Sequence, residues 1–319
     1  MLSYLVRRLL VAVPLLLLIS FVVFGIMHLL PYDVIDSFAT PDMDREALEA
    51  LRERYGLNDP FLVQYGRWIL GVLQGDFGYS LISRHSIADD LLTKIPNSIS
   101  LVLPAYLIAL VLAITLGLVA GANRGRITDT VIDTSNALFI SMPPFWFALL
   151  VMYFLGFQLR LFPIIGMHSV GRTDFPDFLQ HLVMPGLVLI VAFYPDMSRY
   201  VRSSTITQLN EDYVMVQRAF GASKREIFAG HISRHVLLPV ITQLGLALPM
   251  LVTGALITET IFAWPGVGKY FADAINNFDY PVVMAVLLLS AALVIIGNLL
   301  ADISYRLADP RVRLKGAAA

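Results

Sequence analysis

The sequence predicts an all-α protein that crosses a membrane several times. Of its 319 residues, 57% are hydrophobic and only 15% are charged, whereas soluble domains average about 25% charged residues. Five charge-free stretches are long enough to cross a hydrocarbon core of about 30 Å as helices. The net charge of −1 and the absence of cysteine argue against a general nucleic-acid binder, a disulfide framework and a thiolate metal site.

Six membrane-spanning helices are expected. Five come from the long charge-free stretches 9–30, 98–122, 137–159, 236–258 and 281–301. The sixth is the shorter stretch 182–195, which continues into the polar Asp196. The first stretch is about twice as long as a signal-peptide core and no small-x-small cleavage site follows it, so an uncleaved helix is favoured over a signal peptide.

The basic residues predict that both termini are cytoplasmic. In this orientation the inner segments hold 14 Lys and Arg in 80 residues, and the outer segments hold 9 in 111. Cytoplasmic loops of membrane proteins carry such an excess of Lys and Arg. The chain then divides into an N-terminal helix with a helical outer loop (1–93), a five-helix membrane domain (94–308) and a cytoplasmic tail (309–319).

The long outer loop is expected to hold two helices. Residues 44–55 begin with acidic side chains and are followed by Gly56, which is typical of a helix that ends at a left-handed glycine. Residues 61–74 place apolar side chains on one stripe. This second helix either lies flat on the outer leaflet or belongs to a small folded cap with its own core.

Small residues recur every four positions along the second span, at Ala105, Ala109, Ala113, Gly117 and Gly121. Such spacing lets helix backbones approach closely, so this stripe predicts a buried helix–helix contact. Prolines interrupt several spans and predict kinks or breaks; they are Pro104, Pro143, Pro144, Pro185, Pro195 and Pro249. Asp302 precedes Arg306 by four residues, a spacing that suits an ion pair at the inner rim. No charged side chain falls at the middle of a span, which argues against a proton relay.

The inner loop between the fourth and fifth spans carries a helix, a sharp turn and a second helix. Asn210 is the expected N-cap of the first helix, with Tyr213, Val216 and Phe220 on its apolar face and Gly221 at its end. Ser223 and Glu226 have the spacing of a capping box. The segment is either a docking element for a soluble partner or a surface helix that rests on anionic lipid.

The sequence lacks the motifs of an enzyme. His231 and His235 have a zinc-ligand spacing, but Ile232 stands where zinc proteases carry a glutamate and no third ligand is evident. No nucleophile elbow and no phosphate-binding loop occurs. We therefore expect no enzyme activity, no metal and no cofactor in this chain.

Four motifs together resemble the permease subunits of bacterial ABC importers for dipeptides and oligopeptides. They are Tyr213–Pro239, Ile257–Gly268, Asp279–Val283 and Asp309–Arg313. The resemblance implies a type I ABC importer bundle in the bacterial inner membrane. It also implies several partners: a second homologous permease, two cytoplasmic ATPases that bind ATP and magnesium, and an extracytoplasmic binding protein that delivers peptide.

The sequence departs from the general permease motif in two places. Met215, Val216 and Gln217 stand where the motif has Glu-Ala-Ala, and Pro239 lies 18 residues after Gly221, a longer spacing that the peptide-importer group shares. By position, the resemblance implies that the ATPases are contacted by a coupling helix made of Arg218, Ala219, Gly221, Ala222, Ser223, Lys224 and Glu226. A nickel-chelate importer is the close alternative, and an ion-coupled carrier that works alone is the distant one.

A rigid turn is expected just beyond the outer end of the fifth span, at Glu259, Trp264, Pro265 and Gly266. It either touches the binding protein or shapes the outer gate. The alternative is that Trp264 is an aromatic anchor at the membrane interface.

Overall fold

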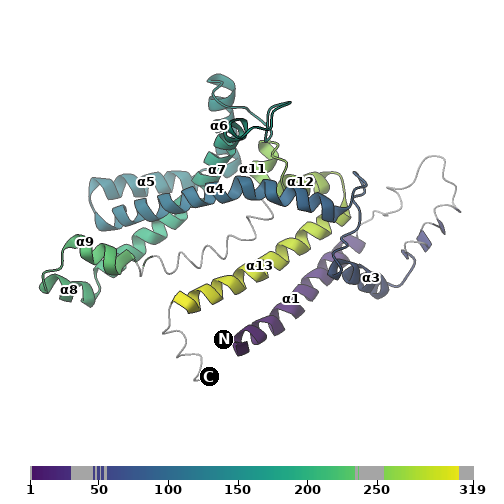
Figure 1. Cartoon of the computed structure of the whole chain (residues 1–319), viewed down its shortest axis with the longest axis horizontal. Coiled ribbons are helices and arrows are strands. Elements are labelled where there is room, and N and C mark those ends of the chain that lie inside the picture. Colours follow the sequence, from purple (N-terminus) through teal and green to yellow (C-terminus); the bar gives the residue numbers. More distant parts are fainter. Residues whose placement is uncertain are drawn as a thin grey trace.

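The computed structural model describes residues 2–29, 46, 49–50, 52–53, 56–233, 236 and 255–308. Within them the chain is helical apart from turns, loops and one isolated bridge between Tyr79 and Ser86. Figure 1 shows the short helices α8 and α9 at one end of the longest axis and α3 and α12 toward the other.

The elements follow one another as α1 (Leu2–Leu29), α3 (Phe61–Leu73), α4 (Ile87–Ala122), α5 (Ile127–Ser141), α6 (Pro144–Val151), η2 (Met152–Gln158), α7 (Phe175–Leu209), α8 (Asp212–Ala219), α9 (Lys224–Ile227), η3 (Phe228–Ile232), α11 (Leu256–Ile261), α12 (Val267–Asn276) and α13 (Tyr280–Ala308). Both η elements are π-helical.

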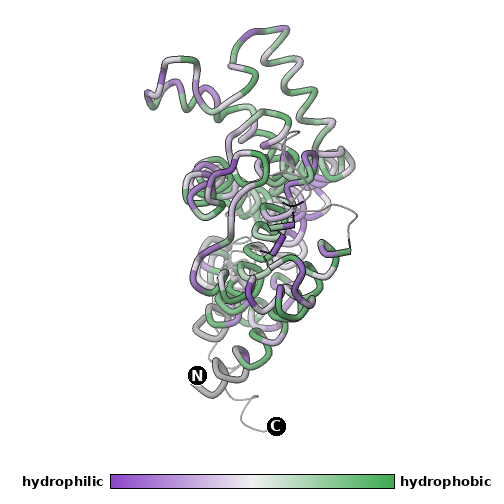
Figure 2. The backbone as a smooth tube through the Cα atoms, turned by 90° about the vertical axis from the view of Figure 1, so that its right-hand side faces the viewer, coloured by the Kyte–Doolittle hydropathy of each residue, from purple (hydrophilic) through white to green (hydrophobic). Residues whose placement is uncertain are grey.

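Four of the described helices, α1, α4, α7 and α13, are long and apolar enough to cross a membrane. The bent pair of α5 and α6 with η2 makes a fifth candidate span. The expected span 236–258 and the tail 309–319 lie mainly or wholly outside the described residues. Figure 2 shows the hydrophobic residues that dominate the long helices.

The third expected span, 137–159, is broken rather than straight. Helix α5 ends at Ser141, and the chain turns by 99° before it continues as α6 and η2. The break falls at Pro143 and Pro144, which lack backbone N–H donors and cannot continue the hydrogen-bond pattern of helix α5. Figure 1 shows α6 standing away from the direction of α4 and α5.

Helix α3 packs on α1 and has no buried residue of its own. Phe61, Tyr65 and Trp68 place their rings within 5.7 Å of the Phe24 ring centroid, while Leu62 and Leu73 are exposed. The described residues therefore do not form a cap with its own core. Most of the helix expected at 44–55 lies outside the described residues, although those described within it are helical and Gly56 has the expected positive φ of 65°.

Helix α1 also packs against α13. Arg8 Nη2 lies 2.5 Å from Asp302 Oδ2, so Asp302 pairs with the first helix. The side chain of Arg306, its expected partner, is outside the described side chains. Helix α4 passes through Lys94 without interruption, so the domain boundary placed there falls inside a helix.

The centre of the molecule is the pair α4 and α7. Both are more than 30 residues long, and buried residues from them enter four of the hydrophobic clusters. A further cluster joins the start of α4 to α12 and α13. The functional elements described next are attached to the two ends of this pair.

Candidate functional site

The segment after α7 forms the α8–α9 elbow, by which we mean residues 210–233. Gly221 has a φ of +85°, which is strained for residues with a side chain. The N–H of Gly221 donates to the carbonyl of Arg218, and the N–H of Ala222 donates to that of Gln217, both at 3.0 Å. These bonds close the end of α8, so the expected glycine turn is confirmed.

Ser223 and Glu226 form the expected capping box at the start of α9. The backbone N–H of Ser223 donates to Glu226 Oε2 at 2.7 Å and its hydroxyl donates to the same oxygen at 2.8 Å. The N–H of Glu226 donates to Ser223 Oγ at 3.3 Å. The Ser223 N–H, followed by its hydroxyl, favours the ionised carboxylate and holds the pKa of Glu226 below its ordinary value. The side chain of Lys224 is outside those that the structure describes.

The prediction that Asn210 is the N-cap of α8 was wrong. Asn210 ends α7 instead, and its Nδ2 donates to the carbonyl of Ile206 at 3.0 Å. Glu211 occupies the cap position of α8 without a side-chain hydrogen bond. Because α7 extends as far as Leu209, the amide side chain of Asn210 binds one of the last carbonyl groups of α7 and does not cap α8.

Of the expected apolar face of α8, Tyr213 packs partly buried against the bundle, whereas Val216 and Phe220 are exposed. Val214 is 1% exposed and turns toward the bundle. Met215, Val216 and Phe220 are 70%, 53% and 88% exposed. The expected residues therefore do not form one face: Val216 and Phe220, together with Met215, point away from the rest of the chain.

The elbow is fixed to the bundle by a hydrophobic cluster. Val214 and Ile227, from the two arms of the elbow, are buried against Val201 of α7. Residues of α4 add half-buried contacts to this cluster; they are Leu110, Ile114 and Leu118. The elbow is therefore positioned by both central helices, and a movement of either α4 or α7 displaces it.

The small-residue stripe of α4 lies against α7. Ala109 and Ala113 are fully buried, and Gly117 and Gly121 are buried as well. A Cβ atom on Gly117 would lie 2.7 Å from the carbonyl oxygen of Ser198, and one on Gly121 would lie 2.6 Å from Cβ of Thr205. These distances leave no room for a side chain, so glycine is required for the observed approach of the two helices.

Polar contacts that the sequence analysis did not identify join α5 to α7. Arg202 donates from Nε to Asp129 Oδ1 at 2.5 Å and from Nη2 to Asp129 Oδ2 at 3.0 Å. Asn136 Nδ2 donates to Ser198 Oγ at 3.1 Å, and both residues are fully buried. A signal existed in the sequence, since Asp129 and Asp133 lie about one turn apart on one helix and Arg199 and Arg202 lie about one turn apart on the other.

At the opposite end of α4, the Glu259 cluster joins this helix to the turn before α12. It consists of Asn97, Ser98, Glu259, Trp264, Pro265 and Gly266. Ser98 Oγ donates to Glu259 Oε1 at 2.8 Å and accepts from the N–H of Val267 at 2.8 Å. Trp264 Nε1 donates to the Asn97 carbonyl at 2.8 Å, and Asn97 Nδ2 donates to the Pro265 carbonyl at 3.0 Å.

Glycines make room for the carboxylate of this cluster. A Cβ atom on Gly266 would overlap Glu259 Oε2 and Ser98 Oγ, and one on Gly268 would lie 2.8 Å from Leu256 Cα. Glu259 Oε2 also accepts from the N–H of Lys269 at 3.1 Å. The carboxylate therefore binds the start of α12 while Ser98 holds it to α4.

The cluster contradicts one alternative for Trp264, the aromatic anchor at the membrane interface. Its side chain is 0% exposed and packs beside Phe178, with ring centroids 5.8 Å apart. Anchoring at the membrane interface needs an exposed indole, whereas contact of the turn with a binding protein does not, since Pro265 is exposed; that contact stays a prediction. Sequence reasoning missed the burial because Asn97 and Ser98, which complete the site, lie more than 160 positions earlier in the chain.

Most of the chain matches two parts of one protein family. Residues 113–314 match the description "binding-protein-dependent transport system inner membrane component", and residues 1–102 match its N-terminal part. The chain belongs to this family.

Relatives of this inner membrane component align over nearly their full lengths. An oligopeptide transport system permease protein of Bacillus subtilis is 36% identical, with 98% of this chain and 99% of the relative covered. A putative peptide permease protein of Brucella suis is 35% identical, with 98% and 100% covered. A glutathione transport system permease protein of Salmonella typhimurium is 33% identical, with 99% and 100% covered.

The Glu259 cluster lies where the two matched parts of this inner membrane component meet. Asn97 and Ser98 belong to the N-terminal part, and Glu259 and Trp264 belong to the other. The α8–α9 elbow lies entirely in the second part. Among the described residues, no group of three or more His, Asp and Glu side chains is placed to hold a metal ion; His235 is outside them.

Proposed function

We propose that this chain is the membrane-spanning permease subunit of an ATP-driven importer of short peptides. The family describes a membrane component of a binding-protein-dependent transport system. The names of its relatives refer to oligopeptides, peptides and glutathione, and glutathione is itself a tripeptide. The shared substrate class is a small peptide, which favours a peptide importer over a nickel-chelate importer.

The proposed assembly has two permease halves. This chain forms one half of the pathway and a homologous permease forms the other, with two ATPases on the cytoplasmic side and a peptide-binding protein on the outer side. ATP and magnesium bind to the ATPases. In this proposal the chain has six spans and both termini are cytoplasmic, with 94–308 as the permease part and 1–93 as an N-terminal addition.

The observation that carries the proposal is the exposed apolar face of the α8–α9 elbow. Met215, Val216 and Phe220 are exposed on a segment whose opposite face is buried against α4 and α7. Apolar anchors at the centre of an interface supply most of its binding energy. We assign this face to an ATPase, with the coupling residues 218–226 around it, because a fixed element can transmit the movement of a soluble partner to the bundle.

The Glu259 cluster is proposed to frame the outer gate. Glu259, Trp264, Pro265 and Gly266 link α11 and α12 to the N-terminal third of α4 by four hydrogen bonds, of which the two made by Ser98 are buried. An arrangement of this kind moves as one unit, so the gate would open by displacement of the whole unit. The binding protein would then act on exposed residues around the cluster and not on Trp264 directly.

The test replaces Gly221 with alanine in the complete transporter. Gly221 has a positive φ and nothing within 4 Å of its added Cβ, so the substitution acts through backbone strain, at roughly 1–2 kcal/mol. We expect an approximately tenfold loss of ATP-driven uptake of a labelled tripeptide into membrane vesicles, or loss of ATPase co-purification, while the permease still inserts.

Gly230→Ala is the matched control. Gly230 is also exposed, with nothing within 4 Å of an added Cβ, but its φ is not positive. This variant should transport normally. Full uptake by Gly221→Ala would contradict the coupling role of the elbow, and ATP-independent uptake by the unmodified transporter would contradict the importer itself.

A further inference from the structure

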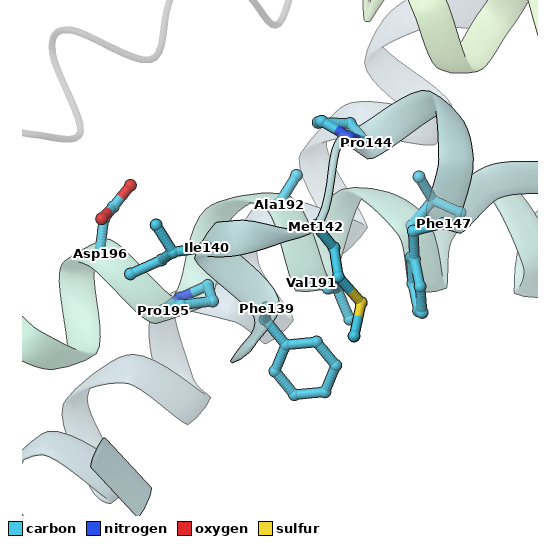
Figure 3. Close-up of a pocket in the computed structure, with 10 residues that line it drawn as sticks. Phe139, Ile140, Met142, Pro144, Phe147, Val191, Ala192, Pro195 and Asp196 are labelled. Carbon is cyan, nitrogen blue, oxygen red and sulfur yellow. The ribbon is translucent and has the colours of Figure 1, made fainter. Parts of the chain in front are cut away.

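The break in the third span leaves a cavity of about 200 Å³ between α5, α6 and α7. Phe139 and Met142 line it before the break, Phe147 lines it after the break, and Val188 and Pro195 line it from α7. All of these side chains are apolar. One charged residue, Asp196, lines the same cavity and lies at its edge beside Ile140 and Pro195 (Figure 3).

Asp196 differs from the other carboxylates that neighbour α7. Asp129 is paired with Arg202, and Asp133 lies 3.9 Å from Arg199. Within the described residues, Asp196 has neither a hydrogen bond nor an ion pair, and it is exposed. The stretch 237–258, which is mostly undescribed, contains no Lys or Arg. Asp196 directly follows the expected span 182–195, so its carboxylate lies at the inner end of the membrane-crossing part of α7, where water or a cation can reach it.

The backbone around the cavity supplies hydrogen-bond acceptors and few donors. Pro195 has no N–H to offer to the carbonyl of Val191, which lines the cavity. Helix α5 ends at Ser141, so its last carbonyls and the negative end of its dipole lie at this break. Pro143 and Pro144 remove two N–H groups from the start of α6. The start of α6 carries the positive end of its own dipole at the same break, but the N–H groups of Trp146 and Phe147 are already bonded to the Pro143 carbonyl. Together with the exposed carboxylate of Asp196, the polar groups at the cavity favour a cation.

We propose that this cavity binds the terminal ammonium group of a peptide in transit, with Asp196 as its counter-ion. The apolar walls would hold the first side chain of the peptide. The cavity is smaller than the ~300–1,000 Å³ of pockets that enclose a whole small-molecule ligand, so it receives one end of the substrate. The identification of the ligand as a peptide rests on the proposed function. The preference of the cavity for a positive charge does not depend on that function.

The first experiment uses the absence of native cysteine. Ala192 lines the cavity, and Ala192→Cys in the complete transporter is modified with thiosulfonate reagents that carry either a positive or a negative charge. We expect the cationic reagent to react at least tenfold faster than the anionic one, relative to their rates with a free thiol. Adding Asp196→Asn should reduce this ratio to near one.

Asp133→Asn is the matched control, because it removes the same charge from α5 at a position that does not line the cavity. It should leave the reagent ratio within about twofold of its original value. An unchanged ratio in the Asp196→Asn variant, or an equal fall in the Asp133→Asn variant, would overturn the assignment of Asp196 as the counter-ion.

The second experiment identifies the ligand. Trialanine should slow the modification of Ala192→Cys in the transporter, N-acetyl-trialanine should not, and Asp196→Asn should abolish the difference. Equal protection by both peptides, or protection by neither, would overturn the ammonium proposal. ATP-driven uptake of trialanine is measured in parallel: its absence would count against the proposed function, whereas the reagent ratio would still report the charge preference of the cavity.

Discussion

At the scale of single residues, the α8–α9 elbow depends on backbone conformation and local hydrogen bonds. Gly221 has no side chain, and its role is to adopt a positive φ that other residues adopt only with strain. Ser223 and Glu226 satisfy each other's backbone N–H groups. Both features are visible in the sequence because the spacing of a turn and its caps is local.

The pKa of Glu226 predicts how this elbow responds to acid. Its folded-state pKa is lowered by the Ser223 N–H and hydroxyl, so its stabilising contribution is present above the unfolded pKa of about 4.3 and is lost as the pH falls through the folded value. Hydrogen-exchange protection of residues 223–227 should therefore decrease below about pH 4.

Glu226→Gln provides the control for this titration. Its amide side chain does not titrate, so the protection of residues 223–227 should be lower at neutral pH and should no longer change with acidification. A wild-type elbow whose protection stays constant from neutral pH to well below the ordinary glutamate pKa would contradict the role of the ionised carboxylate.

At the scale of elements, α4 and α7 form an interface that only small side chains permit. The sequence predicts the stripe and its burial, because small residues every four positions favour close contact between the backbones of membrane helices. It does not identify α7 as the partner. That information lies in Ser198, Val201 and Thr205, whose complementarity to the stripe depends on the relative rotation of two helices.

Gly117→Ala should destabilise this interface, because the added Cβ would lie 2.7 Å from both Ser198 O and Val201 Cβ. Overpacking of this kind costs about 1–3 kcal/mol, so the thermal unfolding temperature of the detergent-purified complex should fall. Gly186→Ala on α7 has nothing within 4 Å of the new atom and should unfold like the unmodified protein. Equal stability of the two variants would show that the stripe can accept side chains.

Trp264 allows the Glu259 cluster to be tested. Trp264→Ala removes a fully buried side chain, at about 3–5 kcal/mol, so the yield of assembled transporter should fall sharply. Trp264→Phe keeps most of the volume and loses the bond to the Asn97 carbonyl, at about 1 kcal/mol, and should assemble with a lower unfolding temperature.

Trp146→Ala is the comparison, because this indole is 45% exposed. It should affect assembly far less than Trp264→Ala. If the Trp264→Ala transporter assembles normally but loses stimulation of ATP hydrolysis by the binding protein, the indole acts at a contact surface and the packing role is wrong.

The Glu259 cluster also marks the limit of local sequence reasoning. The turn itself was predicted from Pro265 and Gly266, but its partners are Asn97 and Ser98 on α4. Nothing in a single sequence links positions that are so far apart. In contrast, the Asp129–Arg202 pair could have been inferred, because two acidic residues about one turn apart occur on one helix and two basic residues about one turn apart on the other.

At the scale of the whole molecule, sequence hydropathy recovers the long helices well. The expected spans match α1, α4, α7 and α13, and prolines indicate the break between α5 and α6. The 99° angle of that break could not be predicted, because a proline removes a hydrogen bond without setting the direction in which the chain continues.

The orientation in the membrane remains a prediction of the basic residues, and the protein's lack of cysteine makes it straightforward to test. Tyr79 and Ile127 are 63% and 82% exposed. A membrane-impermeant thiol reagent applied to intact cells should label Tyr79→Cys directly and Ile127→Cys only after permeabilisation, because residues 31–97 are expected outside and residues 123–136 inside. Labelling of Ile127→Cys in intact cells would reverse or invalidate this topology.

The pairing of α1 with α13 joins the first and last helices of the chain, through contacts that include Arg8 and Asp302. During synthesis on the ribosome, Asp302 is added only after most of the chain has been made, so the Arg8–Asp302 ion pair cannot form before then. At roughly 5–20 residues per second, this interval lasts roughly 15–60 s. For that time the nascent α1 must be held by lipid, by the insertion machinery or by α3, and premature termination before α13 is complete would leave α1 without its contacts to that helix.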